Sequence, residues 1–586
     1  MAEEIEMQKN FYVDKKNYVF RSIQHYDRKK KGAVPEKIYI GKLGSDSRHF
    51  IPNKNYYRLY PEQRKKEEAP LQSDSLAFGS FVVFDRVIED LHLRECLGYA
   101  FSEDDEDRVS QAEYMKADLV LDLACYMIRE ESGDIQHFPS YCYKNQILSG
   151  RIPTDSEISQ FFRDGITDRV RERFLLKWRS LNSAESGEPI FVCYDSTNFN
   201  SVSEGISFLE YGYAKDDRTK PQFNLECVIR SKDGLPLAYD TFPGSVIDVR
   251  QCKKMIDLLK KLGYTNITIV CDRGYISKEN IEFIIEQGYS FLFMVKDNLV
   301  IKKNVVSEHG DEIRDRSECY YPQYDIFAKS FADTIYDGLK VYHHVFYTSD
   351  VSPDDRRFFF DTIDRKKEEL AGMVGKKIEA PKTQLEAAYG KYFDLVYGEE
   401  QGDRLILKSF SKNSEKVDRE FRALGFYTMM TDKEMEIPKV MEQYKLRDRA
   451  EKNFCYMKTG MGLKSFHTQS RETTLSKVFV CFVASIIRSV LVEKTRQLRY
   501  ERKDSKSYTV NAVLGELSKI EASRTAFSEK RIIRYVLTNR QKTILNQFGI
   551  KEEDVDKKLS SLQEKPEGKT ADSKGNHDID IKSATR

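Results

Sequence analysis

The sequence predicts an α/β protein built from several structural units, and three observations support this. The chain of 586 residues is longer than the size at which a single hydrophobic core keeps growing. From Pro189 to Lys296, short apolar segments typical of strands alternate with amphipathic helical segments. A stretch rich in aromatic strand candidates then separates this core from an apolar helix around Val478.

The predicted organisation is an α/β core in two parts, interrupted by an insertion. A β/α region precedes the core and a helical region follows it. The expected regions are a small β-hairpin unit (1–70), a helical region (71–186), the first part of the core (187–296), a mostly β insertion domain (297–435), the second part of the core with the helix of Glu451 (436–495), a helical C-terminal region (496–563) and a disordered tail (564–586).

The core segments follow one another in a definite order. PIFVCYD is predicted as a short strand that ends in Asp195, and further strands are expected at FLEYGYA, QFNLECVIR and LPLAYDTF. The core is completed by a predicted helix at VRQCKKMIDLLKKLG, the strand NITIVCD ending in Asp272, the helix SKENIEFIIEQG and the strand YSFLFMVK ending at Lys296. This succession is that of a ribonuclease H-like sheet, although many other α/β proteins alternate strands and helices.

The insertion is predicted to be mostly β because five aromatic segments punctuate it. These are KVYHHVFYT, RRFFFDTI, KYFDLVYG, DRLILKSF and GFYTMMT. One charged helical segment interrupts them. His343 and His344 would point to opposite faces of the first of these strands, and we interpret them as an inert pair.

Composition excludes several classes of protein. The 95 basic and 94 acidic residues nearly cancel, so any affinity for nucleic acid must come from local basic surfaces. The most apolar stretch, Val478–Val492, contains Arg488 and suits a buried helix better than a membrane span. The acidic start, MAEEIEMQKNF, has no apolar signal core, so we expect a cytoplasmic location. Ten singly scattered cysteines indicate reduced, buried thiols rather than disulfides or a zinc site.

Asp195 and Asp272 are the first candidate site residues. Each ends an apolar strand, where a side chain can leave the core. If the two strands are neighbours, about 4.8 Å apart, both carboxylates can reach one metal ion. The alternative is that each aspartate caps a turn or the next helix, which is the commoner role of such a residue taken alone.

A second motif lies in EQYKLRDRAEKNFCYMKTGMG. Tyr444, Arg447, Glu451 and Lys458 stand at offsets of three, seven and fourteen residues from the first of them. On one continuous α-helix these side chains occupy a stripe about 60° wide and about 21 Å long. The sequence therefore predicts a polar row that faces a groove, and the alternative is a solvated helix with ordinary charge pairs.

These residue types suit phosphodiester cleavage and transfer by two divalent metal ions. In this interpretation Asp195 bridges both ions, Asp272 holds one and Glu451 the other. Arg447 would grip phosphate with its fork and Lys458 as a point charge, while Tyr444 would hydrogen-bond a phosphate or stack on a base. Lys296, at the end of a core strand, is a further candidate for contact with phosphate.

The sequence resembles the DDE transposases of bacterial insertion sequences, in the branch of insertion sequence group four marked by Tyr-x2-Arg-x3-Glu-x6-Lys. The resemblance rests on Tyr444, Arg447, Glu451 and Lys458, and on the segments YDSTNF, FPGSVID and DRGY. It covers roughly Pro189 to Val492.

The resemblance implies a ribonuclease H-like core and dependence on two Mg2+ ions, for which Mn2+ would substitute. It further implies cutting of double-stranded DNA at both inverted-repeat ends, transfer into target DNA, a homodimer in the DNA complex and a bacterial, nucleoid-associated protein without a membrane role. The base-stacking tryptophan of some relatives has no counterpart, because the only tryptophan, Trp178, precedes the core.

Two alternatives remain at this point. One is a nuclease of the same fold that cuts without joining strands. The other is a catalytically idle or domesticated DNA-binding protein. In either case the helical region with Arg169, Arg171, Arg173 and Arg179 is a candidate DNA-reading module of helix-turn-helix type or, equally, a helical bundle with a charged face.

Overall fold

The computed structural model divides into two compact units, which are described separately. One comprises Met1–Ser75, Ala522–Arg534 and Leu559–Arg586, and the other Leu76–Glu521 and Tyr535–Lys558. The structure describes residues 5–27, 32–44, 46, 48–60, 74–103, 109–182, 189–201, 203, 206, 208–212, 217–246, 248–296, 300–336, 338–378, 380–398, 405–504, 506–524 and 530–564. The expected disordered tail, apart from Glu564, and the basic turn at 29–31 lie outside these residues.

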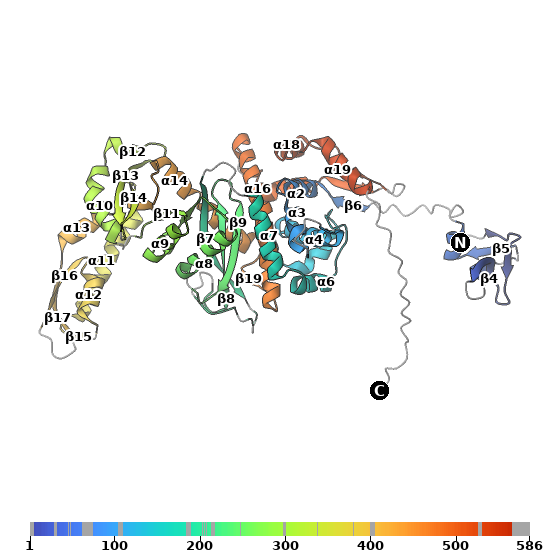
Figure 1. Ribbon diagram of the computed structural model, residues 1–586, viewed down its shortest axis with the longest axis horizontal. Helices are drawn as coiled ribbons and strands as arrows, with labels where there is room; N and C mark the ends of the chain where they lie inside the picture. Colours follow the sequence, from blue (N-terminus) through green and yellow to red (C-terminus); the bar gives the residue numbers. More distant parts are fainter. Residues whose placement is uncertain are drawn as a thin grey trace, which may run out of the picture. The chain divides into compact units, whose positions relative to one another are not determined.

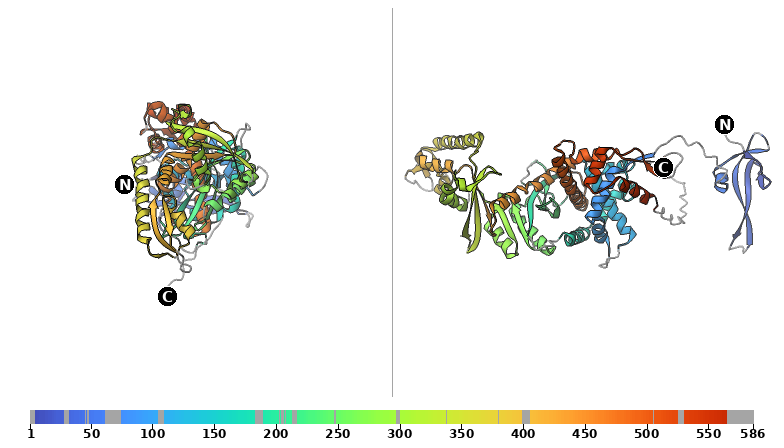
Figure 2. Two further views of the ribbon diagram at one scale, coloured as in Figure 1. Left: turned by 90° about the vertical axis from the view of Figure 1, so that its left-hand side faces the viewer. Right: turned by 90° about the horizontal axis from the view of Figure 1, so that it is seen from above.

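The N-terminal segment forms a five-stranded antiparallel sheet of order β1-β5-β4-β3-β2. Figure 2 shows its long β3–β4 hairpin in blue. Phe11, Val19 and Ile40 are buried on one face together with residues of the short helix α1. The elements are β1 (Ile5–Glu6), β2 (Phe11–Val13), β3 (Tyr18–Asp27), β4 (Gly32–Leu43), β5 (His49–Pro52) and α1 (Lys54–Leu59).

A helical region surrounds one long apolar helix, α16 (Arg471–Arg502), which packs against α2, α4, α17 and α18 (Figure 1). By length and composition α16 could cross a membrane, but 78% of its most apolar window is buried inside the protein, as in a central core helix. The other helices are α2 (Gly79–Asp90), α3 (Leu93–Phe101), α4 (Gln111–Glu130), α5 (Phe138–Cys142), α6 (Asp155–Gln160), α7 (Asp168–Leu181), α17 (Val510–Leu517), α18 (Asn539–Gln547) and α19 (Glu552–Glu564). The short strands β6 (Asp74–Ala77), β20 (Glu521–Arg524) and β21 (Arg531–Ile533) form a sheet of order β21-β20-β6.

The four arginines of the helical region are engaged within the protein. Arg173 is buried and donates to the carbonyl of Tyr99, and Arg179 donates to the carbonyl of Gly263. Arg169 and Arg171 likewise donate to main-chain carbonyls. This arrangement favours the helical bundle over a DNA-reading helix, because the guanidinium groups already hold the protein together.

The core is a ten-stranded sheet of order β12-β13-β14-β18-β11-β10-β7-β8-β9, with β19 beside β7, within the described residues. Strands β7, β10 and β11 are parallel, and β8 and β9 extend the sheet antiparallel to β7. The α/β class predicted from the sequence is confirmed. The core elements are β7 (Ile190–Ser201), β8 (Gln222–Arg230), β9 (Pro236–Pro243), α8 (Asp248–Lys261), β10 (Ile267–Cys271), α9 (Lys278–Glu286), β11 (Ser290–Met294) and β19 (Ser465–Phe466).

The insertion is mixed α and β rather than mostly β. RRFFFDTI, predicted as a strand, lies inside α11 (Pro353–Met373), where Ser352 caps the helix and a proline starts it. Strands β12 (Tyr320–Tyr321), β13 (Ile326–Ile335), β14 (Leu339–Tyr347) and β18 (Phe426–Thr431) continue the core sheet. The remaining elements are α10 (Val300–Ile313), β15 (Lys377–Ile378), α12 (Lys382–Tyr389), β16 (Phe393–Tyr397), β17 (Leu405–Lys412) and α13 (Ser414–Arg422), of which the strands form a sheet of order β15-β17-β16.

Two further expectations were wrong in part. FLEYGYA forms no strand among its described residues, and only Glu210 makes a β-bridge, to Gln222. All ten cysteines are free and nine are buried, but Cys455 is exposed. The surface position of Cys455 follows from the helix of Glu451, whose outer side carries it.

His343 and His344 on β14 are both fully buried. His344 hydrogen-bonds Ser330 (2.8 Å) and Thr431 (3.1 Å), and His343 contacts Asp333 (3.1 Å). Burial and the neighbouring His343 lower the pKa of His344 to about 4. Both imidazoles are therefore neutral in the folded protein at neutral pH, and protonating them opposes folding.

We predict that acid destabilises the sheet through His344. In the unfolded protein the imidazole has an ordinary pKa near 6.5, whereas in the folded protein it binds a proton only near pH 4. The neutral His344 therefore contributes its full stabilisation of the folded state above pH 6.5, and this contribution is lost as the pH falls from 6.5 toward 4. The contribution is about 2 kcal/mol between pH 6.5 and pH 5. The melting temperature of His344→Asn should therefore fall less between pH 7 and pH 5 than that of the parent. The exposed His137→Asn serves as control, and an equal fall in all three proteins would contradict the prediction.

Candidate active site

The register of the central strands brings Asp195 and Asp272 level. Parallel pairing joins Cys193 of β7 to Val270 of β10, so the same register carried two residues further sets Asp195 opposite Asp272. The sequence predicted a strand that ends at Asp195. Strand β7 instead continues to Ser201, because β8 pairs with it past this residue. Both aspartates are half-buried at the point where β10 ends and the sheet opens.

Each aspartate also fulfils the local capping role. Asp195 accepts a hydrogen bond from the main-chain nitrogen of Ser196 (2.9 Å), and Asp272 accepts one from that of Arg273 (2.7 Å). Asp272 thereby caps the short helix η4 (Arg273–Tyr275). These bonds hold one oxygen of each carboxylate in place without burying it, so a capping and a binding role are compatible.

The helix of Glu451 is broken, contrary to the continuous helix that the sequence spacing suggested. Helix α14 (Ile437–Lys445) ends before Arg447, and α15 (Asp448–Cys455) starts after it. The turn between them is tightened, with a hydrogen bond from the nitrogen of Ala450 to the carbonyl of Arg447 (2.9 Å).

Beyond α15 the turn widens into the π-helical segment η6 (Tyr456–Gly460), which carries Lys458. A uniform rotation of 100° per residue therefore does not apply, and the predicted stripe is replaced by a bent row. Gly460 ends this segment, as expected. Helix α15, which carries Glu451, packs against β7, the strand of Asp195, and against β8.

Arg447 lies at the centre of the candidate site. Its Nη2 forms an ion pair with Oε1 of Glu451 (2.7 Å), and its guanidinium lies 5.5 Å from the ring centre of Tyr444. Burial lowers the pKa of Arg447, but the charges of Tyr444, Glu451, Asp272 and Asp195 outweigh burial and raise it. All three acids thus act on one guanidinium.

The side chain of Arg447 is much less exposed to solvent than that of its ion-pair partner, Glu451. The side chain of Arg447 is 17% exposed and that of Glu451 is 51% exposed. The buried Nε of Arg447 has no hydrogen-bond partner among the described residues. Glu451 is therefore free to turn outward, whereas Arg447 stays beneath it.

Tyr444 and Lys458 flank this centre. The hydroxyl of Tyr444 donates to the sulfur of Met294 at the end of β11 (3.4 Å), which is a weak acceptor, and burial raises the pKa of this phenol. The ammonium of Lys458 lies 5.7 Å from the ring centre of Phe199 on β7. Lys296 is half-buried two residues beyond β11, and the structure does not join it to the acids within the described residues.

A buried polar network supports the aspartates from behind. Tyr194 donates to Glu226 (2.5 Å), which also accepts from Gln251 (3.3 Å). Tyr275 of η4 donates to Ser196 (2.9 Å) and its ring lies 4.8 Å from that of Tyr194. The network ties β7, β8, α8 and η4 together next to Asp195 and Asp272. Sequence reasoning missed it, although the residues that flank Asp195 gave the signal.

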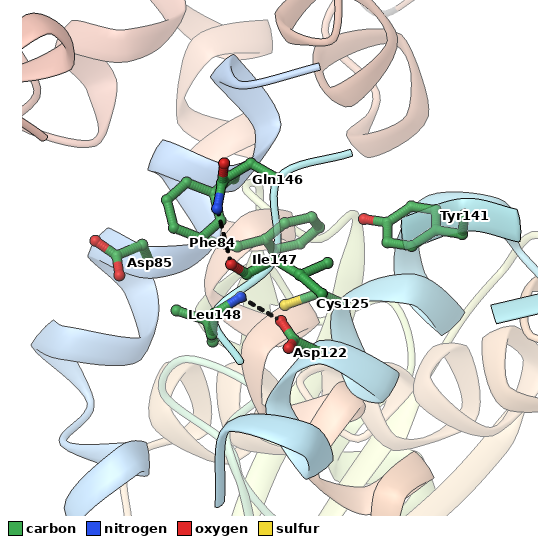
Figure 3. A pocket seen from close by; sticks show the side chains of 9 residues that line it. Phe84, Asp85, Asp122, Cys125, Tyr141, Gln146, Ile147 and Leu148 are labelled. Atoms are coloured by element: carbon green, nitrogen blue, oxygen red, sulfur yellow. Dashed lines mark hydrogen bonds between the residues drawn. The ribbon is translucent and has the colours of Figure 1, made fainter. Parts of the chain in front are cut away.

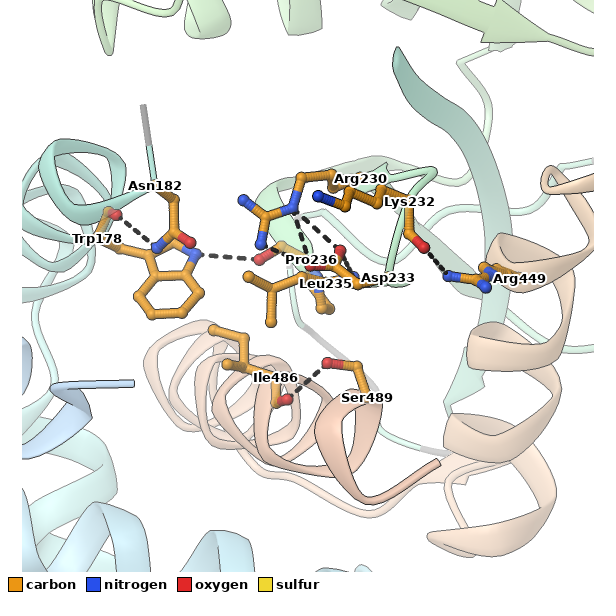
Figure 4. Close-up of polar contacts among 10 residues, drawn as sticks. All are labelled: Trp178, Asn182, Arg230, Lys232, Asp233, Leu235, Pro236, Arg449, Ile486 and Ser489. Atoms are coloured by element: carbon orange, nitrogen blue, oxygen red, sulfur yellow. Dashed lines mark hydrogen bonds and ion pairs between the residues drawn. The ribbon is translucent and has the colours of Figure 1, made fainter. Parts of the chain in front are cut away.

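Contacts of Arg449 hold α15 against the sheet, as Figure 4 shows for its hydrogen bond to Lys232. Nη1 of Arg449 donates to the carbonyl of Lys232 in the β8–β9 turn (2.6 Å), and Arg449 also pairs with Glu493 of α16 (3.6 Å). On the other side of this turn, Nε1 of Trp178 donates to the carbonyl of Pro236 (3.0 Å). Trp178 is fully buried, so it has no face for a base, as the sequence suggested.

A small cavity lies in the helical region. It is lined by Phe84, Asp122 and Cys125 among others (Figure 3). Asp122 accepts hydrogen bonds from the main-chain nitrogens of Leu148 (2.7 Å) and Ser149 (2.9 Å), and burial raises its pKa to about 7. These bonds anchor a loop, and the cavity is a packing defect beside them.

The three acids fit divalent metal ions in donor type. Among the described residues no group of three or more His, Cys, Asp or Glu stands close enough to hold a metal ion as arranged. Arg447 forms an ion pair with Glu451, and the charges of Asp272 and Asp195 also raise the pKa of Arg447. Hard oxygen donors of this kind are those that Mg2+ prefers, and an outward-turning Glu451 can complete the set.

Comparison with known proteins now decides the family. Residues 186–487 match the family described as the transposase DDE domain. The chain belongs to this family of DDE transposases. The matched residues of this transposase include Asp195, Asp272 and Glu451, together with most of the insertion.

Other comparisons add little to this result. Among solved structures the transposase is similar to the piggyBac transposase synaptic complex with hairpin DNA, with 10% sequence identity over 84% of this chain and 83% of that chain. The TM-score is 0.32, which is too low to support an argument from that structure. No curated protein matches the chain.

We predict that Glu226 is structurally indispensable. Glu226→Ala leaves the hydroxyl of Tyr194 and the amide of Gln251 buried without a partner, at a cost of about 1–3 kcal/mol for each group. The melting temperature of Glu226→Ala should lie several degrees below that of the parent, and the decrease should be smaller for Glu226→Gln. Glu434→Ala, at an exposed position, is the control. An unchanged melting temperature for Glu226→Ala would show that the network does not support the site.

Proposed function

We propose that this transposase cleaves double-stranded DNA at the inverted-repeat ends of an insertion sequence and transfers the ends into target DNA, by cut-and-paste transposition. The observation that carries the proposal is the register that sets Asp195 opposite Asp272, together with the ion pair between Glu451 and Arg447. The order of strands around β7 supports a ribonuclease H-like core, because β11, β10, β7, β8 and β9 follow one another as in that fold.

Asp195, Asp272 and Glu451 would hold two Mg2+ ions, for which Mn2+ can substitute. When bound, such ions activate water or a 3′ hydroxyl and stabilise the leaving oxygen. Asp195, between the other two acids in the arrangement of strands and helix, is suited to bridge the two ions. Glu451 must first turn away from Arg447, and its exposure of 51% permits this without repacking the sheet.

Arg447 then becomes available to the scissile phosphate. A guanidinium released from Glu451 presents a fork that matches two phosphate oxygens. Tyr444 exchanges the weak sulfur acceptor of Met294 for a phosphate oxygen, and Lys458 adds a point charge further along the row. We assign Lys296 a more distant contact with phosphate, on the basis of its place just beyond β11.

The proposed partners follow from this chemistry. They are the inverted-repeat ends, target DNA and a second copy of the chain, since two ends must be cut and joined together. We place the protein in the bacterial cytoplasm, associated with the nucleoid while bound to DNA. The overall charge of +1 requires that DNA meet local basic surfaces rather than the molecule as a whole.

We predict that Asp195→Ala, Asp272→Ala and Glu451→Ala each abolish cutting but spare DNA binding, because each removes a metal ligand and none removes a basic side chain. The assay incubates the protein and Mg2+ with duplexes that carry the element ends, and follows nicking, joining and gel retardation separately. A loss of cutting of at least about 1,000-fold is expected.

Asp217→Ala is the matched control, because the side chain of this aspartate bonds with Thr219 and Lys220 of its own loop and its main-chain carbonyl is unchanged by the substitution. Binding without any nicking by the parent protein would favour an idle or domesticated DNA-binding protein. Nicking without joining would identify a nuclease, and full cutting by Asp195→Ala would refute the proposed site.

A further inference from the structure

The N-terminal sheet has one face that α1 leaves uncovered. Residues alternate along its strands, so that Val19 and Ile40 enter the core beside α1 while their neighbours Phe20 and Tyr39 point the other way. Phe11 and Tyr12 divide in the same manner on β2. We call the uncovered side the aromatic face. It consists of Tyr12, Tyr18, Phe20 and Tyr39, with Lys37 and Lys42 on the same side.

The aromatic side chains touch one another, and the three tyrosines are exposed around the buried ring of Phe20. Phe20 lies at the centre, with ring centres 5.8 Å from Tyr12 and 5.7 Å from Tyr39, and Tyr18 meets Tyr39 edge to face at 6.3 Å. The exposed fractions are 52% for Tyr12, 44% for Tyr18 and 41% for Tyr39. Three exposed tyrosine rings on one face of the sheet indicate a binding surface rather than scattered exposure.

The segment that contains this face is rich in basic residues, and two lysines lie on the face itself. Residues 5–60 contain thirteen Lys and Arg but five Asp and Glu, whereas the whole chain has a net charge of only +1. The ammonium of Lys37 lies 4.7 Å from the ring centre of Phe20, and Lys42 is exposed opposite Tyr18. The excess of basic residues in the sequence is therefore local to this small sheet.

The exposed rings and the lysines together indicate which ligand the aromatic face binds. A second copy of the same face would bring positive charge against positive charge, which opposes self-association. A polyanion with flat apolar groups matches both the rings and the lysines. Duplex DNA stacks its bases inside the helix, so only unpaired nucleotides offer base faces to rings on a sheet.

We propose that the aromatic face binds unpaired nucleotides of DNA, with bases stacked on Tyr12, Tyr18 and Tyr39 and phosphates paired with Lys37 and Lys42. The inference rests on the proposed function in one respect, that DNA is the substrate. Single-stranded nucleotides produced by cutting at element ends would be the ligand of this face.

The test measures fluorescence anisotropy of the full-length protein with a labelled oligothymidylate of about 20 nucleotides and with a duplex of mixed sequence and equal length. The single strand should bind more tightly than the duplex. Tyr39→Ala should weaken binding of the single strand about tenfold or more, since one lost stacking contact has an effect of that size. Tyr39→Phe keeps the ring and should bind as the parent does.

Controls separate this inference from misfolding and from the proposed function. Tyr500→Ala, at a tyrosine that is 87% exposed on α16, should leave binding of the single strand unchanged. Asp195→Ala should bind the single strand normally although it cannot cut. Equal binding by Tyr39→Ala and the parent, tighter binding of duplex, or a change only in oligomeric state would each overturn the inference, even where metal-dependent cutting is intact.

Discussion

The parallel pairing of β7 with β10 is the constraint on which the site depends. Its register places Asp195 level with Asp272, and the long antiparallel pairing with β8 keeps β7 straight past the first aspartate. A slip of one residue would turn Asp195 to the opposite face of the sheet. The buried network of Tyr194, Glu226, Gln251 and Tyr275 opposes such a slip, because these residues come from four different elements.

Arg447 has two roles in this account. Without DNA, it pairs with Glu451, and the charges of Asp272 and Asp195 also raise its pKa. With DNA, the same guanidinium would serve the phosphate once the acids hold metal ions. The break between α14 and α15 makes both roles possible, because it seats Arg447 in the bend rather than on a straight helical face.

The sequence predicted the α/β class and, apart from the strand expected at FLEYGYA, the order of core strands and helices, whereas the roles of the site residues stay predictions. It failed where tertiary pairing overrides local pattern. RRFFFDTI has the aromatic content of a strand, but a capped helix start and charged residues along α11 make it helical. The end of β7 depends on its pairing with β8, and the bend at Arg447 depends on the packing of α15 against β7 and β8. Neither feature can be predicted from residue spacing alone. The domain boundaries and the role of Lys296 stay predictions.

The central claim is that Asp195, Asp272 and Glu451 can share divalent ions. Cleavage of the protein backbone by hydroxyl radicals, generated from Fe2+ bound in place of Mg2+, tests this claim most directly because it reports where the metal sits. The account predicts cuts next to these three residues, suppressed by excess Mg2+ and lost in Asp195→Ala. Cuts elsewhere in the chain, or cuts that persist in Asp195→Ala, would contradict it.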